Sequence, residues 1–372
     1  MMRVLLVDDT LNVGGKERLV LTALRCLPRD RMSVHLCLTG SPGVLGGEAL
    51  RLADDSIVCG RRSPFSPRVV RAISRFVSSR RIQILHCNGT VDLLHAWAAV
   101  RWSGARLVCS VHGHASGVHR LLGRFLLRRC DAVAPVSESL LGDMRRDGYR
   151  SRRFVVIPNC YDPAFGKLPS ALRGPRPDDG SLRLVCVSRF DWFKDQLTLV
   201  RAVGRAVASG ADARLDFVGD GRERYVQPVR LAVEELGLSE RIRFLGTRRD
   251  VPALLGGYDA FALSSFADSF GIAAVEAMAS GLPVMLSDIP PFRELVRGGR
   301  DGMLFPPGSP DAAARCISEL AGSSSLRAGL AGKALARSGD FSPSAYAERL
   351  GEFYASLVEE GASSAGAHGG RP

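Results

Sequence analysis

This 372-residue chain has few lysines, no closely spaced cysteines and no long apolar runs. No apolar run approaches the roughly 18–20 residues needed to span a bilayer. The apolar start after Arg3 is interrupted by Asp8 and Asp9, so it predicts a buried first strand rather than a secretion signal. The nine cysteines never lie closer than eleven positions apart, which excludes a Cys-x-x-Cys zinc or redox motif. Cysteines scattered through apolar segments fit the core of a cytoplasmic protein.

Only four residues are lysine, yet the formal net charge is +12. Residues 1–165 hold 25 Lys and Arg against 13 Asp and Glu, so the whole excess lies in that half. A basic half attracts anionic partners. No nucleic-acid motif accompanies it, so we expect no nucleic-acid partner. An acidic acceptor or an anionic membrane surface fits better, which would place a cytoplasmic protein peripherally at the inner face of the cell membrane.

Short apolar segments alternate with helical patterns along most of the chain. Such alternation predicts parallel sheets with helices on both faces, here two doubly wound domains. Ligands of these sheets bind outside the carboxyl ends of the strands, so we expect a site in a cleft between the domains. The expected strands are 3–7, 33–38, 82–86, 107–111, 132–136, 154–157, one beginning at 182, 214–218, 242–245, 260–262 and 283–286, and the expected helices include 16–26, 67–79, 93–102, 118–130, 272–279 and 343–357.

Gly, Pro and charged residues concentrate between the two series of strands, which predicts a linker at 166–181. The expected domains are therefore 1–165 and 182–342. A last helix at 343–358 follows the second domain. The Gly-, Ala- and Ser-rich end, 359–372, predicts a disordered tail.

The most informative stretch runs from Ser264 to Asp288. A helix is expected to begin after the turn at Gly271, so the backbone N–H groups of Ser269, Phe270 and Gly271 would lie at a helix N-terminus, where phosphate binds readily. The carboxylates of Asp268 and Glu276 flank this helix start and could accept hydrogen bonds from hydroxyl groups. This combination predicts a ligand that is part sugar and part phosphate.

Two cations, Arg189 and Lys194, follow the first strand of the second domain. A guanidinium is a bidentate donor and an ammonium a point charge, and together they suit a diphosphate. A solvated basic loop is the alternative interpretation.

The first domain offers a Gly14-Gly15 turn into its first helix and His112 at the end of a strand. The turn lacks the Gly-x-Gly-x-x-Gly pattern, which argues against an NAD-dependent enzyme. His112 could hydrogen-bond a sugar hydroxyl or act as an acid or base, while a loop histidine is the alternative. His114 and His119 lie nearby, but no acid stands at metal-ligand spacing, so we expect no metal site.

Two helices, 68–81 and 118–130, are basic and amphipathic. A surface helix packed on a core is the favoured interpretation. Docking on a membrane surface is the alternative.

In this order, the motifs resemble glycosyltransferase family 4, a group of retaining enzymes with the two-domain GT-B fold. The resemblance extends from the start of the chain to Leu357. It rests on Gly14-Gly15-x-Glu17, His112, Pro158-Asn159-Cys160-Tyr161-Asp162, Arg189 with Lys194, and Asp268 to Glu276 followed by Ala277-Met278-Ala279-x-Gly281-x-Pro283.

The resemblance implies an acceptor-binding first domain, a donor-binding second domain and a last helix that crosses back to the first. Arg189 and Lys194 would hold the diphosphate of a nucleotide sugar, Gly15 would approach its phosphates, and Glu276 would accept hydrogen bonds from its ribose. Asp268, Ser269, Phe270 and Gly271 would contact the transferred sugar, and His112 would reach the hydroxyls of that sugar. The family usually has Glu at the position of Asp268 and Gly at that of Cys160.

The implied reaction is front-face substitution with retention, from a UDP- or GDP-sugar, with no metal and no cofactor. The favoured acceptor is a lipid-linked glycan for surface polysaccharide or glycolipid, and a soluble small molecule such as a secondary metabolite is the alternative. A GT-B nucleotide-sugar epimerase or phosphorylase, and a non-catalytic nucleotide-sugar-binding protein, are the other hypotheses.

Overall fold

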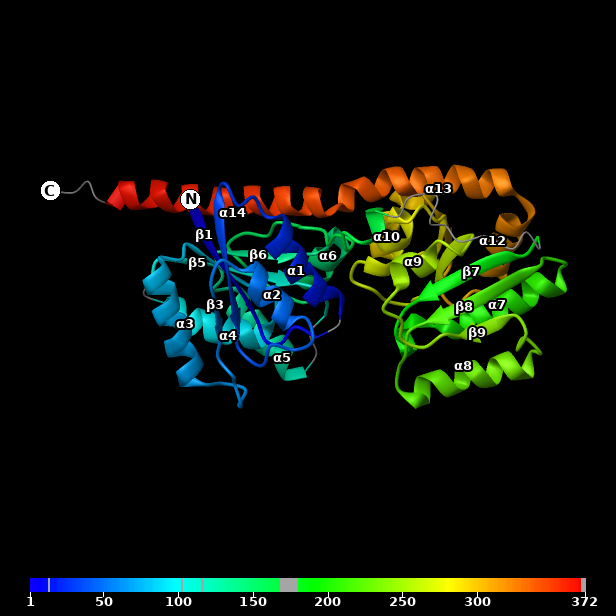
Figure 1. Cartoon of the computed structure of the whole chain (residues 1–372), viewed down its shortest axis with the longest axis horizontal. Coiled ribbons are helices and arrows are strands. Elements are labelled where there is room, and N and C mark those ends of the chain that lie inside the picture. The colour runs from blue at the N-terminus through cyan, green and yellow to red at the C-terminus, as the bar shows by residue number, and fades with distance from the viewer. Residues whose placement is uncertain (13, 102, 115–116, 168–179, 369–372) are drawn as a thin grey trace. The chain divides into compact units, whose positions relative to one another are not determined.

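The computed structural model describes residues 1–12, 14–101, 103–114, 117–167 and 180–368 (Figure 1). The chain forms two compact units. One consists of Met1–Cys160 with Pro343–Pro372, and the other of Tyr161–Ser342. Most of the expected linker lies outside the described residues.

The first unit is built on a six-stranded parallel sheet in the order β3-β2-β1-β4-β5-β6. Consecutive strands add outward from β1 on one side and from β4 on the other, so the order reverses between β1 and β4, which is where doubly wound sheets bind ligands. Side chains of β1 and β2 such as Val4, Leu5 and Leu36 are fully buried. The strands are β1 (Met2–Asp8), β2 (Met32–Leu38), β3 (Ser56–Val58), β4 (Ile84–Cys87), β5 (Arg106–Val111) and β6 (Ala132–Pro135).

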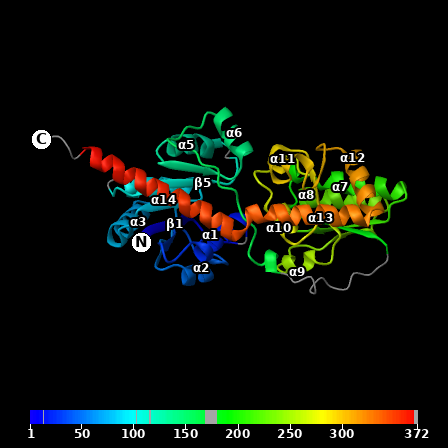
Figure 2. The ribbon, with the colours of Figure 1, turned by 90° about the horizontal axis from the view of Figure 1, so that it is seen from above.

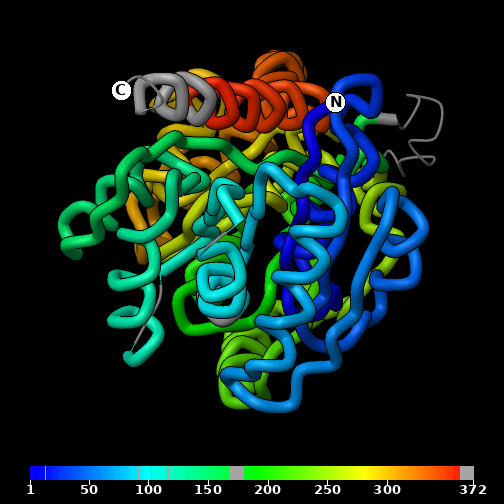
Figure 3. The backbone as a smooth tube through the Cα atoms, turned by 90° about the vertical axis from the view of Figure 1, so that its left-hand side faces the viewer, coloured from blue at the N-terminus to red at the C-terminus, as the bar shows by residue number. Residues whose placement is uncertain are grey.

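Helices cover this sheet on both faces (Figures 1 and 3). They are α1 (Gly15–Cys26), α2 (Gly46–Leu52), α3 (Pro67–Arg80), α4 (Thr90–Val100), α5 (Gly117–Leu127), α6 (Glu138–Arg146) and α14 (Pro343–His368). Figure 2 shows α14 lying along the first unit, where the Oη atom of its Tyr354 contacts His86 of β4. The last helix thus completes the first unit.

The second unit has the same architecture, with a parallel sheet in the order β12-β11-β10-β7-β8-β9. Its strands are β7 (Leu182–Val187), β8 (Ala213–Val218), β9 (Ile242–Phe244), β10 (Ala260–Leu263), β11 (Val284–Ser287) and β12 (Met303–Phe305). Its helices are α7 (Gln196–Ala208), α8 (Glu223–Glu235), α9 (Val251–Leu255), α10 (Ile272–Ala279), α11 (Pro290–Leu295), α12 (Pro310–Gly322) and α13 (Ser324–Ser338), with a 3₁₀ turn, η3, at Trp192–Lys194. The predicted pair of doubly wound parallel domains is confirmed.

Some element predictions were wrong. Residues 154–157 do not form a strand, because Phe154 makes only an isolated bridge to Val133. The last helix does not end near Leu357 but continues to His368, although Gly361 and Gly366 disfavour a helix. The short elements α2, β3, α6 and β12 were not predicted.

Among the helices of the described residues, none combines the length and apolarity that a membrane crossing requires.

Candidate functional site

In the second unit, the loop after β7 is held tightly against the loop after β8. The N–H of Ser188 donates to Val218 O at 3.0 Å, and the N–H of Phe190 donates to Asp220 O at 3.0 Å. A Cβ atom on Gly219 would lie 2.1 Å from Ser188 O, and the φ angle of Gly219 is +128°, so only glycine fits. The loop after β7 carries Arg189, whose side chain is 77% exposed.

Lys194 and Asp268 form an ion pair at the carboxyl end of the same sheet. The Nζ atom of Lys194 donates to Asp268 Oδ2 at 2.6 Å, and both side chains are largely buried. The other oxygen, Oδ1, accepts the backbone N–H groups of Ser269 at 2.8 Å and Phe270 at 3.3 Å. The structure therefore brings together two predicted site residues that lie far apart in the sequence.

Gly271 fixes the start of α10. Its φ angle is +96°, and a Cβ atom at this position would lie 2.6 Å from Phe292 Cε1. The preceding Phe270 is buried edge-on against Phe341, with ring centroids 5.5 Å apart. The N-terminus of α10 therefore lies beside the Lys194–Asp268 pair, and Glu276 is half-buried farther along the same helix. An anion at this position would meet an ammonium and the positive end of a helix dipole.

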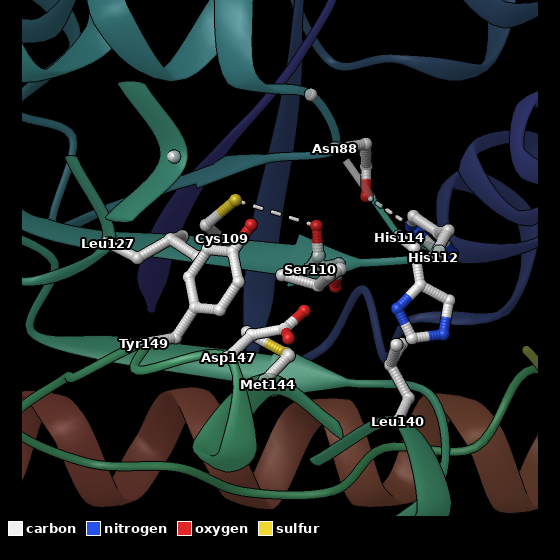
Figure 4. A pocket seen from close by; sticks show the side chains of 14 residues that line it. Asn88, Cys109, Ser110, His112, His114, Leu127, Leu140, Met144, Asp147 and Tyr149 are labelled. Carbon is white, nitrogen blue, oxygen red and sulfur yellow. Dashed lines mark hydrogen bonds between the residues drawn. The ribbon is translucent and has the colours of Figure 1, made fainter. Parts of the chain in front are cut away.

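The first unit contains a pocket of about 270 Å³ at the carboxyl ends of β4 and β5 (Figure 4). Polar groups and apolar side chains both line it, which suits a ring that carries hydroxyl groups. The lining residues are Asn88, Gly89, Cys109, Ser110, Val111, His112, Gly113, His114, Gly123, Leu127, Leu140, Met144, Asp147 and Tyr149.

His112 lies in the wall of this pocket as a neutral imidazole. Burial, helped by the nearby charge of Lys16, lowers its pKa to about 4. Its Nε2 lies 3.3 Å from Asn88 Oδ1 and donates to it, because a carbonyl oxygen can only accept. His114, by contrast, pairs with Asp143 at 3.2 Å.

A buried charged cluster at the end of β1 was not predicted. Lys16 Nζ, in the first turn of α1 next to Gly15, lies 2.7 Å from Oδ1 of the fully buried Asp8. Burial opposes the charge of Lys16, but the acidic groups of Asp8, Glu17 and Asp92 together outweigh burial and raise the Lys16 pKa. Burial also raises the pKa of Asp92 to about 7, although Thr39 donates a hydrogen bond to it at 2.7 Å. An acid that ends a strand, followed by a lysine that opens the next helix, is the signal that could have revealed this cluster.

A second unpredicted feature joins the pocket wall to α14. His86 Nε2 lies 2.7 Å from Ser110 Oγ, and His86 Nδ1 lies 2.5 Å from Tyr354 Oη. In the sequence, His86 is indistinguishable from a core residue of a strand.

Within the described ranges, no three His, Cys, Asp or Glu side chains are grouped as metal ligands would be.

Comparisons with known proteins agree on one family. Residues 13–165 match the model described as Glycosyltransferase Family 4, and residues 181–323 match Glycosyl transferases group 1. The phosphatidyl-myo-inositol mannosyltransferase of Mycobacterium leprae is 34% identical over 336 residues, which cover 84% of this chain and 85% of that protein. The D-inositol 3-phosphate glycosyltransferase of Corynebacterium glutamicum is 30% identical over 252 residues, covering 64% and 60%.

Solved structures agree on the fold. The Anabaena protein HepE aligns with 95% of this chain and all of its own, at a TM-score of 0.82 and 24% identity. Given the two parallel sheets, the matched models and the mycobacterial relative, this chain belongs to glycosyltransferase family 4 and is a glycosyltransferase with the GT-B fold.

Proposed function

We propose that this glycosyltransferase moves a sugar from a UDP- or GDP-sugar to an acceptor hydroxyl, with retention of the anomeric configuration. The observation that carries the proposal is the 2.6 Å pair of Lys194 and Asp268 beside the N-terminus of α10. An ammonium and a helix N-terminus suit a diphosphate, and a carboxylate next to them suits the hydroxyls of the attached sugar.

In this proposal, Lys194, Arg189 and the N-terminus of α10 stabilise the negative charge that develops on the departing diphosphate. The reaction breaks the bond between the anomeric carbon and the phosphate oxygen and forms a bond from that carbon to the acceptor oxygen. The departing phosphate takes the acceptor proton, so the main task of the protein is positioning. Because side chains supply the positive charge, the proposed reaction uses no metal ion or other cofactor.

The remaining roles follow the family pattern and are part of the same proposal. Glu276 accepts hydrogen bonds from the ribose hydroxyls. Ser269, Phe270 and Gly271 contact the transferred sugar with Asp268. His112 hydrogen-bonds that sugar as a neutral imidazole, and Gly15 approaches the phosphates.

Two related proteins support a nucleotide-sugar donor and a lipid acceptor. HepE was solved with UDP and with UDP-glucose, and the mycobacterial relative is named for a phosphatidylinositol acceptor. We therefore favour synthesis of a cell-surface polysaccharide or glycolipid at the cytoplasmic side of the membrane. The second candidate is a soluble small-molecule acceptor, which the pocket favours because no Lys or Arg is among the described residues that line it.

The structure gives a physical basis for peripheral membrane contact through α5. In α3 the apolar residues Val69, Ile73 and Val77 are buried, so that face packs on the unit. In α5, Gly123, Leu126 and Leu127 are buried, yet a second apolar face stays exposed, with exposures of 78% for Val118, 64% for Leu121 and 46% for Phe125.

Exposed arginines accompany this second face of α5. They are Arg120, Arg124, Arg128 and Arg129, and the Arg129 guanidinium stacks over Phe125 at 3.5 Å from the ring centroid. An apolar stripe beside cations is the pattern of a helix that lies on an anionic bilayer.

Calorimetric titration with UDP and GDP tests the donor proposal, and it should show binding of one of them. Incubation with candidate UDP- or GDP-sugars and a candidate acceptor should then release that nucleotide, and proton NMR of the glycosylated acceptor should show the anomeric configuration of the donor. Absence of binding by both nucleotides would refute the proposed function. An inverted product would refute retention alone.

A further inference from the structure

Tyr354, His86 and Ser110 form a buried chain of hydrogen bonds from α14 to the pocket. Tyr354 and His86 are 0% and 2% exposed, and Ser110 lies half-buried in the pocket wall. Their contacts are short, at 2.5 Å and 2.7 Å. Figure 4 shows Ser110 on the same wall of the pocket as His112, with Tyr149 and Asp147 also lining it.

The direction of this chain follows from counting protons. A phenol carries one proton, and no other partner of the Tyr354 hydroxyl is found in the part of the chain that the structure describes. If Tyr354 accepted a proton from His86 Nδ1, its own buried proton would have no acceptor, which is costly. Tyr354 therefore donates to Nδ1.

The state of His86 is then determined. Burial lowers its pKa to about 3, so the ring is neutral and carries one proton. Because Nδ1 accepts from Tyr354, that proton is on Nε2 and is donated to Ser110 Oγ. The oxygen of Ser110 is used as an acceptor, and its own proton has no other acceptor among the described side chains.

We propose that Tyr354 and His86 act as positioning residues that make Ser110 a hydrogen-bond donor to the molecule in the pocket. The occupant must then present an acceptor oxygen to Ser110, as a sugar or cyclitol does. This inference deepens the proposed function, because it assigns the pocket to the hydroxylated ring of the acceptor. The direction of the relay itself does not depend on sugar transfer.

The first test determines the tautomer of His86 in the full chain labelled with ¹⁵N-histidine. Long-range ¹H–¹⁵N spectra, with His86 assigned from the His86→Asn variant, should show a neutral ring protonated on Nε2 between pH 5 and 8. Tyr354→Phe should populate the Nδ1-protonated form. The matched control is Tyr346→Phe, since Tyr346 is also buried on α14, and it should leave the His86 signals unchanged. A proton on Nδ1 in the wild type, or equal effects of both phenylalanine variants, would overturn the relay.

The second test measures binding of methyl β-D-glucopyranoside by saturation-transfer NMR titration. Wild type, Ser110→Thr and Tyr346→Phe should bind it alike. Ser110→Ala and Tyr354→Phe should bind about tenfold more weakly, as expected for one lost hydrogen bond. No binding to the wild type, or equal binding to Ser110→Ala, would refute the assignment of the pocket. Failure of the proposed function would show separately, as a lack of UDP and GDP binding.

Discussion

The ammonium of Lys194 lies 2.6 Å from one oxygen of Asp268, while the other oxygen of that carboxylate accepts the N–H of Ser269 at 2.8 Å. A phosphate that approaches Lys194 must therefore share the ammonium with Asp268. The two residues should have opposite effects on the binding of a nucleoside diphosphate.

Lys194→Ala should weaken the binding of UDP or GDP by about 1.5–3 kcal/mol, the usual value of a hydrogen bond to a charged group. Asp268→Asn removes the competing negative charge but keeps an acceptor for Ser269, so it should bind the diphosphate as tightly as the wild type or more tightly. Calorimetric titration measures both. Equal losses in the two variants would place the phosphate elsewhere.

Asp268→Asn should nevertheless transfer sugar more slowly, because the carboxylate is assigned to the transferred sugar. Asp268→Glu restores the residue usual in the family and is the matched control for charge. The turnover number should distinguish Asp268→Asn from Asp268→Glu even where the two variants bind the nucleotide alike.

Gly271→Ala should destabilise the second unit through both backbone strain and a steric clash. An added Cβ would lie 2.6 Å from Phe292 Cε1 at a φ of +96°. Gly298 has a φ of +68° with nothing within 4 Å of an added Cβ, so Gly298→Ala isolates the strain. The Gly271 variant should lose about 1–3 kcal/mol more than the Gly298 variant in chemical denaturation. Equal losses would show that Phe292 moves aside.

Acid should destabilise the chain through its buried histidines. Burial lowers the pKa of His86 to about 3, whereas an unfolded histidine has a pKa of about 6.5. Between these values the unfolded chain binds a proton that the folded chain does not, so the stabilisation is complete above pH 6.5 and is lost as the pH falls. His86→Gln should reduce the slope of unfolding free energy against pH by about 1.4 kcal/mol per pH unit.

Asp92 should act in the opposite direction over the same range. Its folded pKa is raised by burial to about 7, so the folded chain keeps a proton that the unfolded chain loses, and stability falls as the pH rises from about 4 to 7. Asp92→Asn should therefore steepen the slope that His86→Gln flattens. Denaturation curves at several pH values measure both, and slopes that change in the same direction would contradict one of the two assignments.

The α5 surface predicts binding to vesicles that contain an anionic lipid such as phosphatidylglycerol, with binding that falls as salt rises. Leu121→Asp should weaken vesicle binding about tenfold or more, because it removes a leucine side chain that the lipid would bury on binding. Leu335 of α13 is also an exposed leucine, so Leu335→Asp is the matched control and should bind normally. Equal binding by both variants in sedimentation would exclude α5 as the docking surface.

Sequence patterns predicted the parallel architecture because apolar runs such as that from Val4 to Val7 are short and bounded by polar residues, as buried strands are. They missed β3, since its three residues follow Asp54 and Asp55 and bury little. The rule that ligand sites form at the carboxyl ends of strands correctly predicted that Lys194 and Asp268 lie at the same edge of the sheet. No such rule could pair Tyr354 with His86, because that contact depends on where α14 packs against the first sheet.

The first unit is built from two separate segments of the chain, and this determines when its folding can be completed during synthesis. Its sheet is complete once residue 135 has been made, yet α14, which supplies Tyr354, begins only at Pro343. The second unit is one continuous segment and can fold as soon as it leaves the ribosome, since domains fold as units. The first-made sheet therefore waits longest for its last helix, and a ribosome-stalled chain lacking α14 should expose the surface that this helix covers.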